Sequence, residues 1–115
     1  MSDLAVKGVV TVGEGSERRD IVVTELTPAL MRQVLMNNPW PGDQPDDEAV
    51  ARYQVDVWLF EECRLSDLAV FTNQSTADLE ELPPSQLRKV LTKVKEINPD
   101  FFSALDRMKS AQPKN

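Results

Sequence analysis

The order of apolar and polar residues divides the chain into a strand-like start and a helical remainder. Two β-branched runs, at 4–12 and 18–26, flank the glycine-containing segment GEGS at 13–16. Such runs joined by a short glycine loop predict an antiparallel β-hairpin. Because alternate side chains of a strand share a face, we expect the apolar face to comprise Val10, Val12, Ile21 and Val23. An isolated hairpin is marginal in water, so helices or another chain must cover that face.

Apolar residues follow a helical spacing from Thr27 onward. Thr27 suits a helix N-cap, and Pro28 suits the first helical position. A proline-rich loop is expected at 39–46. The expected helices are 28–38, about 47–62, 63–73, 76–82 and two within 83–109. Helix 47–62, with Val50, Tyr53, Val57 and Phe60 on one face, is expected to be the most apolar helix and to lie centrally.

The helix after Pro83 has the clearest pattern in the sequence. Its apolar residues recur at i, i+3, i+4, i+7 and i+10, which predicts one buried face made of Leu87, Val90, Leu91, Val94 and Ile97. Asn98 is expected to cap the last helix, with Pro99 at its first position. We therefore expect a single α+β domain over 1–115, in which an N-terminal antiparallel β-hairpin precedes a mainly α-helical bundle of short helices. Its parts are the β-hairpin (1–26), a helical body (27–82), a C-terminal helical hairpin (83–109) and a flexible tail (110–115).

Composition narrows the range of functions. The chain has 115 residues, no histidine and one cysteine, Cys63. These counts exclude a Ser-His-Asp triad, a Cys-His dyad, a histidine-ligated metal and a disulfide-stapled fold. The net charge of −6 is opposite in sign to that of a broad phosphate-binding surface. No apolar run approaches the roughly 20 residues of a membrane span, and the N-terminus does not resemble a signal peptide. We expect a soluble intracellular protein that is not an enzyme, needs no cofactor and binds neither nucleic acid nor a membrane.

Charge is unevenly distributed along the chain. Residues 1–82 hold sixteen acidic and six basic residues, whereas residues 83–115 hold three acidic and seven basic ones. The basic residues that flank the apolar face of the helix after Pro83 are Arg88, Lys89, Lys93 and Lys95. One interpretation is that this helix docks on the acidic body of the same chain. The alternative is self-association, in which the basic end of one subunit meets the acidic body of the next, head to tail.

Three further features suggest chemistry only weakly. The acidic cluster of Asp43, Asp46, Asp47 and Glu48 lacks the pattern of a calcium loop, so we interpret it as the negatively charged start of a helix. Gly13-Glu14-Gly15 has no third glycine and no following lysine, so we interpret it as a turn. Cys63 has no histidine to activate it and is expected to be a small buried apolar residue.

Three aromatic residues are candidates for partner binding. Phe101 and Phe102 are adjacent on a helix and diverge by about 100°, so both cannot occupy the centre of one buried face. One of them can then anchor a partner. Trp40 lies in the proline-rich loop, where it either folds back on the core or is offered to a ligand. With Arg88, Lys89, Lys93 and Lys95, these residues form the predicted partner-binding set.

Residues 78–105, DLEELPPSQLRKVLTKVKEINPDFFSAL, resemble the C-terminal signature of small tail assembly chaperones of long-tailed bacteriophages. Members show an Asp-Leu-x-x-Leu turn, a Pro-Ser-x-Leu helix start and an x-x-Val-Asn-Pro-x-Phe-Phe ending. The matching positions are Asp78, Leu79 and Leu82; Pro84, Ser85 and Leu87; and Ile97, Asn98, Pro99, Phe101 and Phe102. The upstream order is also similar: a valine-rich hairpin, Glu25-Leu26-Thr27 leading into a helix, and an apolar helix ending in Leu59 to Cys63. Pro83 departs from the threonine that many relatives have there.

The resemblance implies a binding function. Such chaperones coat the long, largely helical tape measure protein before the tail tube polymerises around it, keep it soluble and help to recruit tube subunits. The implied partners are therefore the tape measure protein and the tail tube protein. The implied location is the host cell cytoplasm, since these chaperones are usually absent from the mature virion. Two other classes stay open: a small phage structural protein, such as a head–tail connector or tail-completion subunit, and an acidic inhibitor of a host protein.

Overall fold

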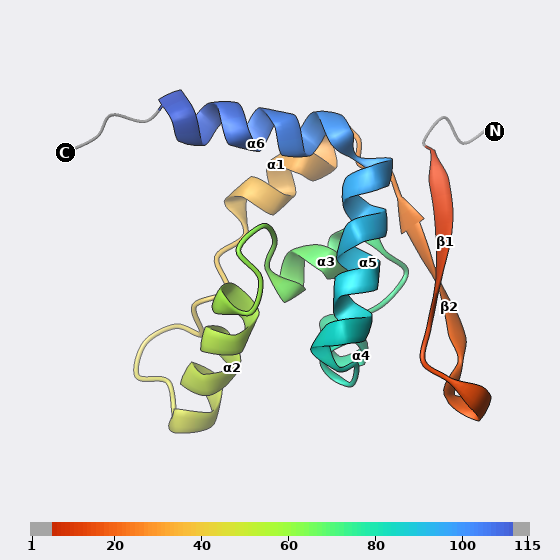
Figure 1. The fold of residues 1–115 in the computed structure, drawn as a ribbon. Coiled ribbons are helices and arrows are strands. Elements are labelled where there is room, and N and C mark those ends of the chain that lie inside the picture. Colours follow the sequence, from red (N-terminus) through yellow and green to blue (C-terminus); the bar gives the residue numbers. More distant parts are fainter. Residues whose placement is uncertain (1–5, 112–115) are drawn as a thin grey trace.

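A β-hairpin followed by a series of short helices makes up the fold, which is known from a computed structural model that describes residues 6–111 (Figure 1). The expected α+β class is confirmed. Residues 110 and 111 continue the last helix, while the rest of the expected tail lies outside the described residues. The elements are β1 (Lys7–Val12), the 3-10 turn η1 (Gly15–Glu17), β2 (Arg19–Thr24), α1 (Pro28–Met36), α2 (Asp47–Trp58), α3 (Leu65–Phe71), α4 (Thr76–Glu80), α5 (Pro84–Ile97) and α6 (Pro99–Ala111).

The hairpin forms in the register that its apolar pattern predicts. Val10 pairs with Ile21, and Val12, Ile21 and Val23 are completely buried while Val10 is partly buried. The turn between the strands depends on Gly13, which has a φ of +81°. A Cβ atom at Gly13 would lie 2.5 Å from the backbone oxygen of Glu17, so only glycine fits the turn predicted there.

Helix α5 covers the apolar face of the hairpin (Figure 1). Four residues of its predicted face, Leu87, Val90, Leu91 and Val94, are buried, and Ile97 is partly buried. Helix α5 lies close to β1 at Gly8, where an added Cβ atom would lie 3.1 Å from Cδ1 of Ile97 and would force that side chain to shift.

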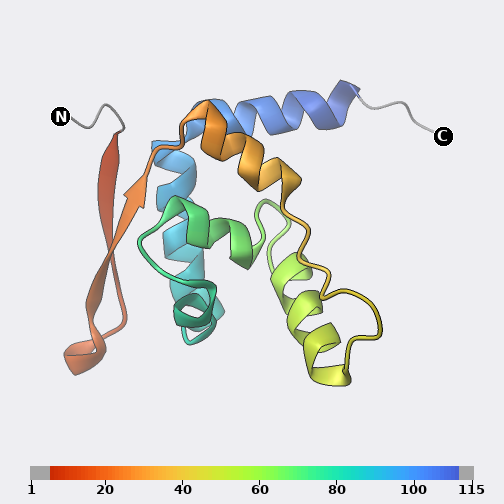
Figure 2. The same ribbon diagram turned by 180° about the vertical axis from the view of Figure 1, so that it is seen from behind.

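Helix α6 crosses the end of α5 instead of returning along it (Figures 1 and 2). The expected helical hairpin at 83–109 is therefore wrong. The reason is Asn98, whose backbone leaves the helical region at φ −123° and ψ 52°. Its side chain was expected to cap α6, but it bonds the end of β2, accepting from Leu26 N–H at 2.8 Å and donating to Thr24 O at 3.3 Å. These bonds fix the corner between α5 and α6.

The short helix α3 occupies the middle of the helical layer, where it contacts α1, α2, α4 and α5. Three of its apolar residues, Leu65, Leu68 and Phe71, are buried. Thr72, directly after α3, forms an isolated β-bridge with Val23 of β2. The core of the molecule therefore lies where α3 and α5 meet the hairpin.

Helix α2 does not lie centrally, contrary to the sequence prediction. It ends at Trp58, not near residue 62, and among its residues only Asp56 is buried. Its helix axis stands apart from the hairpin, with α3, α4 and α5 between them (Figures 1 and 2). The chain leaves the helix because Phe60 turns into the core, where it is 4% exposed. Tertiary packing therefore determines both where α2 ends and where it lies in the fold, without a local stop signal in the sequence.

Candidate functional site

Two of the four predicted basic residues on α5 contact the segment that follows α2. The guanidinium of Arg88 lies 4.5 Å from the centroid of the Phe60 ring and 3.2 Å from a carboxylate oxygen of Glu62. Lys95 Nζ lies 3.7 Å from the same Glu62 oxygen. A hydrogen bond from the backbone of Glu62 is the main factor that lowers the pKa of this carboxyl, and Arg88 and Lys95 add to it. Arg88 and Lys95 thus hold α5 against the segment that follows α2.

The other two basic residues are distributed differently. Lys93 lies beside β1 and pairs with Glu96 of its own helix, with 3.5 Å between Nζ and Oε1. Lys89 is exposed and has no ion pair within residues 6–111. The structure therefore brings Arg88 and Lys95 together around the Glu62 carboxylate, whereas Lys89 and Lys93 form no ion pair with it.

Phe101 and Phe102 form an aromatic cluster with Phe71 of α3. Phe101 is 4% exposed and meets the Phe71 ring edge to face at 5.6 Å, whereas Phe102 is partly buried and stacks on Phe71 at 5.9 Å. Both rings thus anchor α6 to the core. The structure corrects the assignment of Phe101 to a partner-binding surface, because its ring is buried between helices; Phe102 retains a partly accessible face.

Trp40 both packs and remains exposed. Its ring meets the Tyr53 ring edge to face at 5.0 Å, and 46% of its surface is accessible. The contact holds the loop between α1 and α2 against α2. Trp40 therefore stays a candidate for partner binding.

An open apolar groove lies between α2 on one side and α4 with the start of α5 on the other. We call it the α2–α5 groove; it has a volume of about 490 Å³. Its floor consists of Leu65 and Leu87, each 2% exposed, and Val55 on its α2 wall is 52% exposed. Its apolar lining comprises Ala51, Val55, Leu59, Leu65, Leu82 and Leu87. The groove thus joins the core to the surface without a side chain that covers it.

Charged side chains stand at the mouth of the α2–α5 groove. Glu48 and Arg52 contribute from α2, and Glu80 contributes from α4. Arg52 pairs with Glu48 at 3.8 Å, and both side chains are mostly exposed. The rim therefore carries two acids and one base.

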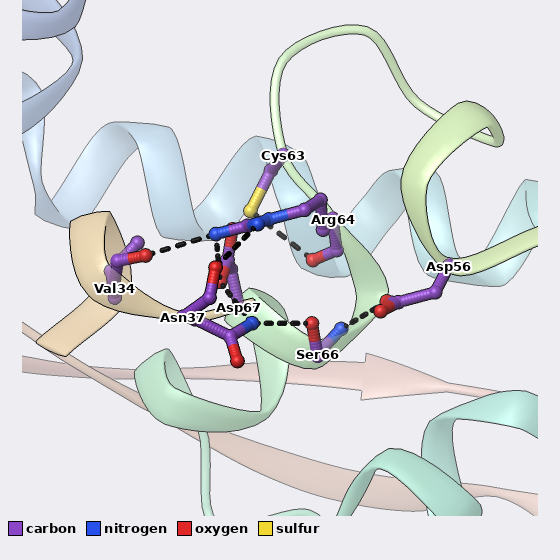
Figure 3. A network of polar contacts seen from close by, with 7 residues as sticks. All are labelled: Val34, Asn37, Asp56, Cys63, Arg64, Ser66 and Asp67. Atoms are coloured by element: carbon purple, nitrogen blue, oxygen red, sulfur yellow. Dashed lines mark hydrogen bonds and ion pairs between the residues drawn. The ribbon is translucent and has the colours of Figure 1, made fainter. Parts of the chain in front are cut away.

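A polar network joins α1 and α3 and extends to α2, which forms one wall of the groove (Figure 3). Arg64 donates from Nε and Nη2 to the two oxygens of Asp67, at 2.7 and 3.1 Å, which is the bidentate geometry suited to a guanidinium. It also donates to the carbonyl oxygens of Val34 and Asn37 at the end of α1, each at 2.9 Å. The last carbonyls of a helix lack full intrahelical bonding. Arg64 therefore adds a donor to the Asn37 carbonyl, and a second donor to the Val34 carbonyl, which also accepts from Asn37 N–H at 3.2 Å.

Asp56 attaches α2 to this network. Its buried carboxylate accepts a hydrogen bond from Ser66 N–H at 2.6 Å, and Ser66 Oγ accepts one from Nδ2 of Asn37 at 2.9 Å (Figure 3). The first bond joins the inner face of α2 to the start of α3. Because Asp56 also lines the α2–α5 groove, this bond sets the position of the groove wall.

The features with weak chemical signals have structural roles. Cys63 is buried beside the network, and burial raises the pKa of its thiol well above the ordinary range, as expected of an unreactive cysteine. Asp46 caps α2 by accepting from Ala49 N–H at 2.8 Å, as the interpretation of the acidic cluster predicts. Among residues 6–111, no group of three or more potential metal-ligating His, Cys, Asp or Glu side chains occurs. Nor does any helix in this part of the chain have the length and apolarity to cross a membrane.

No family model, curated protein or solved structure matches this chain. The resemblance at residues 78–105 therefore rests on its motif residues alone, and the function that it implies stays a prediction.

The α2–α5 groove was not among the sequence predictions, although the sequence contains a signal for it. Helix α2 has a second apolar stripe, made of Ala51, Val55 and Trp58, in addition to the expected one. At 100° per residue, the two stripes lie roughly 130° apart, too far for one buried face. On the expected stripe, the Tyr53 ring packs against Trp40. On the second stripe, Trp58 is 69% exposed. A helix with two apolar stripes indicates that one of them is available to a partner.

Proposed function

We propose that this protein is a tail assembly chaperone of a long-tailed bacteriophage, which binds the tape measure protein, keeps it soluble and supports assembly of the tail tube. It acts in the host cell cytoplasm and leaves before the virion is complete. The motif residues at 78–105 support the proposal, and the observation that carries it is the α2–α5 groove. A protein that holds a long apolar client needs accessible apolar surface beside polar surface that keeps the complex in solution.

The structure offers both properties in one small domain. Val55 and Trp58 expose 52% and 69% of their surface on one stripe of α2, next to the groove. The net charge of −6 opposes aggregation of the complex through repulsion between copies. Most of the motif residues have structural roles, because Leu79, Leu87 and Phe101 belong to the core. The motif thus supports the fold of the binding surface, and the groove supplies the surface itself.

Co-expression with the tape measure protein of the same genome tests the proposal. We expect the client to become soluble and to co-elute with this protein in size-exclusion chromatography. An unrelated insoluble coiled-coil protein, expressed in the same way, should remain insoluble. A client that stays in the pellet while this protein elutes alone would contradict the proposal. Mass spectrometry of purified virions separates the structural alternative, since a stoichiometric amount in the particle indicates a structural subunit.

A further inference from the structure

The apolar stripe of α2 that faces the α2–α5 groove has no partner within residues 6–111. The opposite wall and the floor of the groove are already filled by packed residues, since Leu65 and Leu87 are 2% exposed. Val55 nevertheless leaves half of its surface accessible. One side of a helix–helix packing arrangement is therefore present, and the element that would complete it is missing from this part of the chain.

The shape and lining of the groove favour a helix as the occupant. Helix α2 forms one wall, α4 and the start of α5 form the other, and the lining between the charged rim residues is apolar. Asp56, the polar side chain in the wall, already accepts a hydrogen bond from Ser66 N–H at 2.6 Å. A small-molecule site uses a few free polar groups to orient its ligand, whereas a helix-binding groove needs mainly apolar surface. The α2–α5 groove therefore resembles a helix-binding groove more than a small-molecule site.

The charged residues at the groove mouth favour a partner of a particular charge. Glu48 and Glu80 stand on opposite sides of the groove mouth, and the single base, Arg52, is paired with Glu48. Complementary charges at the edge of an interface select the partner and its orientation. A bound helix should therefore carry basic residues on the flanks of its apolar stripe.

We propose that the α2–α5 groove binds an amphipathic helical segment of the tape measure protein, with apolar side chains at i, i+3 or i+4 and i+7 and with Lys or Arg on both flanks. The inference rests on the proposed function and adds to it the binding surface and the kind of client segment. The apolar stripe of the client would cover Val55 and the groove floor, while its basic residues would meet Glu48 and Glu80.

A pair of matched variants tests the apolar part of the proposal. Val55→Asp places a charge in the groove wall, and Leu35→Asp places one on α1, outside the groove, at a side chain that is 54% exposed. Both sites are exposed, so both variants should fold and show the unfolding transition of the parent. We expect V55D to weaken binding of the tape measure protein at least about tenfold, because a carboxylate would lose its water in the groove, and L35D to leave binding unchanged. Equal binding by V55D and the parent would overturn the proposal.

A second matched pair tests the charge preference. The double variant Glu48→Gln with Glu80→Gln removes two charges from the rim, and Glu14→Gln with Glu17→Gln removes two from the hairpin tip. We expect the rim variant to weaken binding of the tape measure protein roughly fivefold, and the tip variant to have little effect. The difference should shrink as the salt concentration rises. Equal effects of the two double variants would show that only net charge matters and would overturn the rim assignment.

The outcomes distinguish the inference from the proposed function on which it rests. If the parent protein does not bind the tape measure protein at all, the proposed function fails. If the parent and V55D bind equally, the function stands and the groove assignment fails. Light scattering of the free protein adds a further outcome: if V55D alters self-association but not client binding, the groove serves a second copy of the chain and the inference is wrong.

Discussion

Asn98 joins the two halves of the fold through one buried amide. Its Oδ1 accepts from Leu26 N–H, and its Nδ2 donates to the carbonyl oxygens of Thr24 and Val94. The sequence predicted an N-cap here because Asn-Pro is a common helix start. It could not show the partners in and after β2, since these lie 72 and 74 residues away and belong to tertiary structure.

Replacing Asn98 by alanine should therefore destabilise the protein. Leu26 N–H would remain buried without an acceptor, which costs about 1–3 kcal/mol. Asn73→Ala is the matched control, because the Asn73 side chain also bonds a strand N–H, that of Val22 at 3.2 Å, but lies at the surface. Urea unfolding should show a clear loss of unfolding free energy for N98A and a smaller one for N73A. Equal losses would mean that the Asn98 bonds do not tie the helices to the hairpin.

At the scale of elements, the sequence predicts well those that local signals define. The hairpin and α5 follow from apolar periodicity, and α1 begins at Pro28 after its Thr27 cap, whose side chain accepts from Leu30 N–H at 3.3 Å. Helix α2 shows the limit of such signals. Its end, its place outside the core and the groove beside it depend on packing between segments that are distant in sequence, so no local pattern contains them.

The Arg64–Asp67 pair controls how α1 and α3 meet, and its loss should have a large effect. Asp67 is 7% exposed in its side chain, so Arg64→Ala leaves a buried carboxylate without its partner. We expect a loss of about 2–4 kcal/mol in unfolding free energy. Arg64→Lys should recover only part of it, because a lysine cannot form the bidentate contact and also reach the carbonyl oxygens of α1.

The surface pair between Arg52 and Glu48 provides the control for this prediction. Both of its side chains are mostly exposed, so Arg52→Ala should change the unfolding free energy by no more than about 0.5 kcal/mol. Chemical denaturation of the three variants beside the parent measures all these values. If R64A proves no worse than R52A, the network does not hold the helices together.

At the scale of the whole molecule, the structure modifies the meaning of the uneven charge. The acidic body and the basic C-terminal segment meet within one chain, where Arg88 and Lys95 contact Glu62. Lys89 remains exposed, so an interface between copies of the chain is still a prediction. The sequence predicted the α+β class of the fold. It did not predict the α2–α5 groove, because the groove exists only between elements whose arrangement is set by tertiary packing.

Mapping the bound client by NMR tests the central claim most directly. The 15N-labelled protein is titrated with the tape measure protein or its binding fragment, and changes in backbone amide signals are followed residue by residue. We predict that the largest changes occur at residues 48–59, in and directly after α2, and at residues 80–87, from the end of α4 to the first turn of α5, with little change in α6. Changes confined to the face of α5 that bears Lys89 and Lys93, with α2 unaffected, would contradict the account.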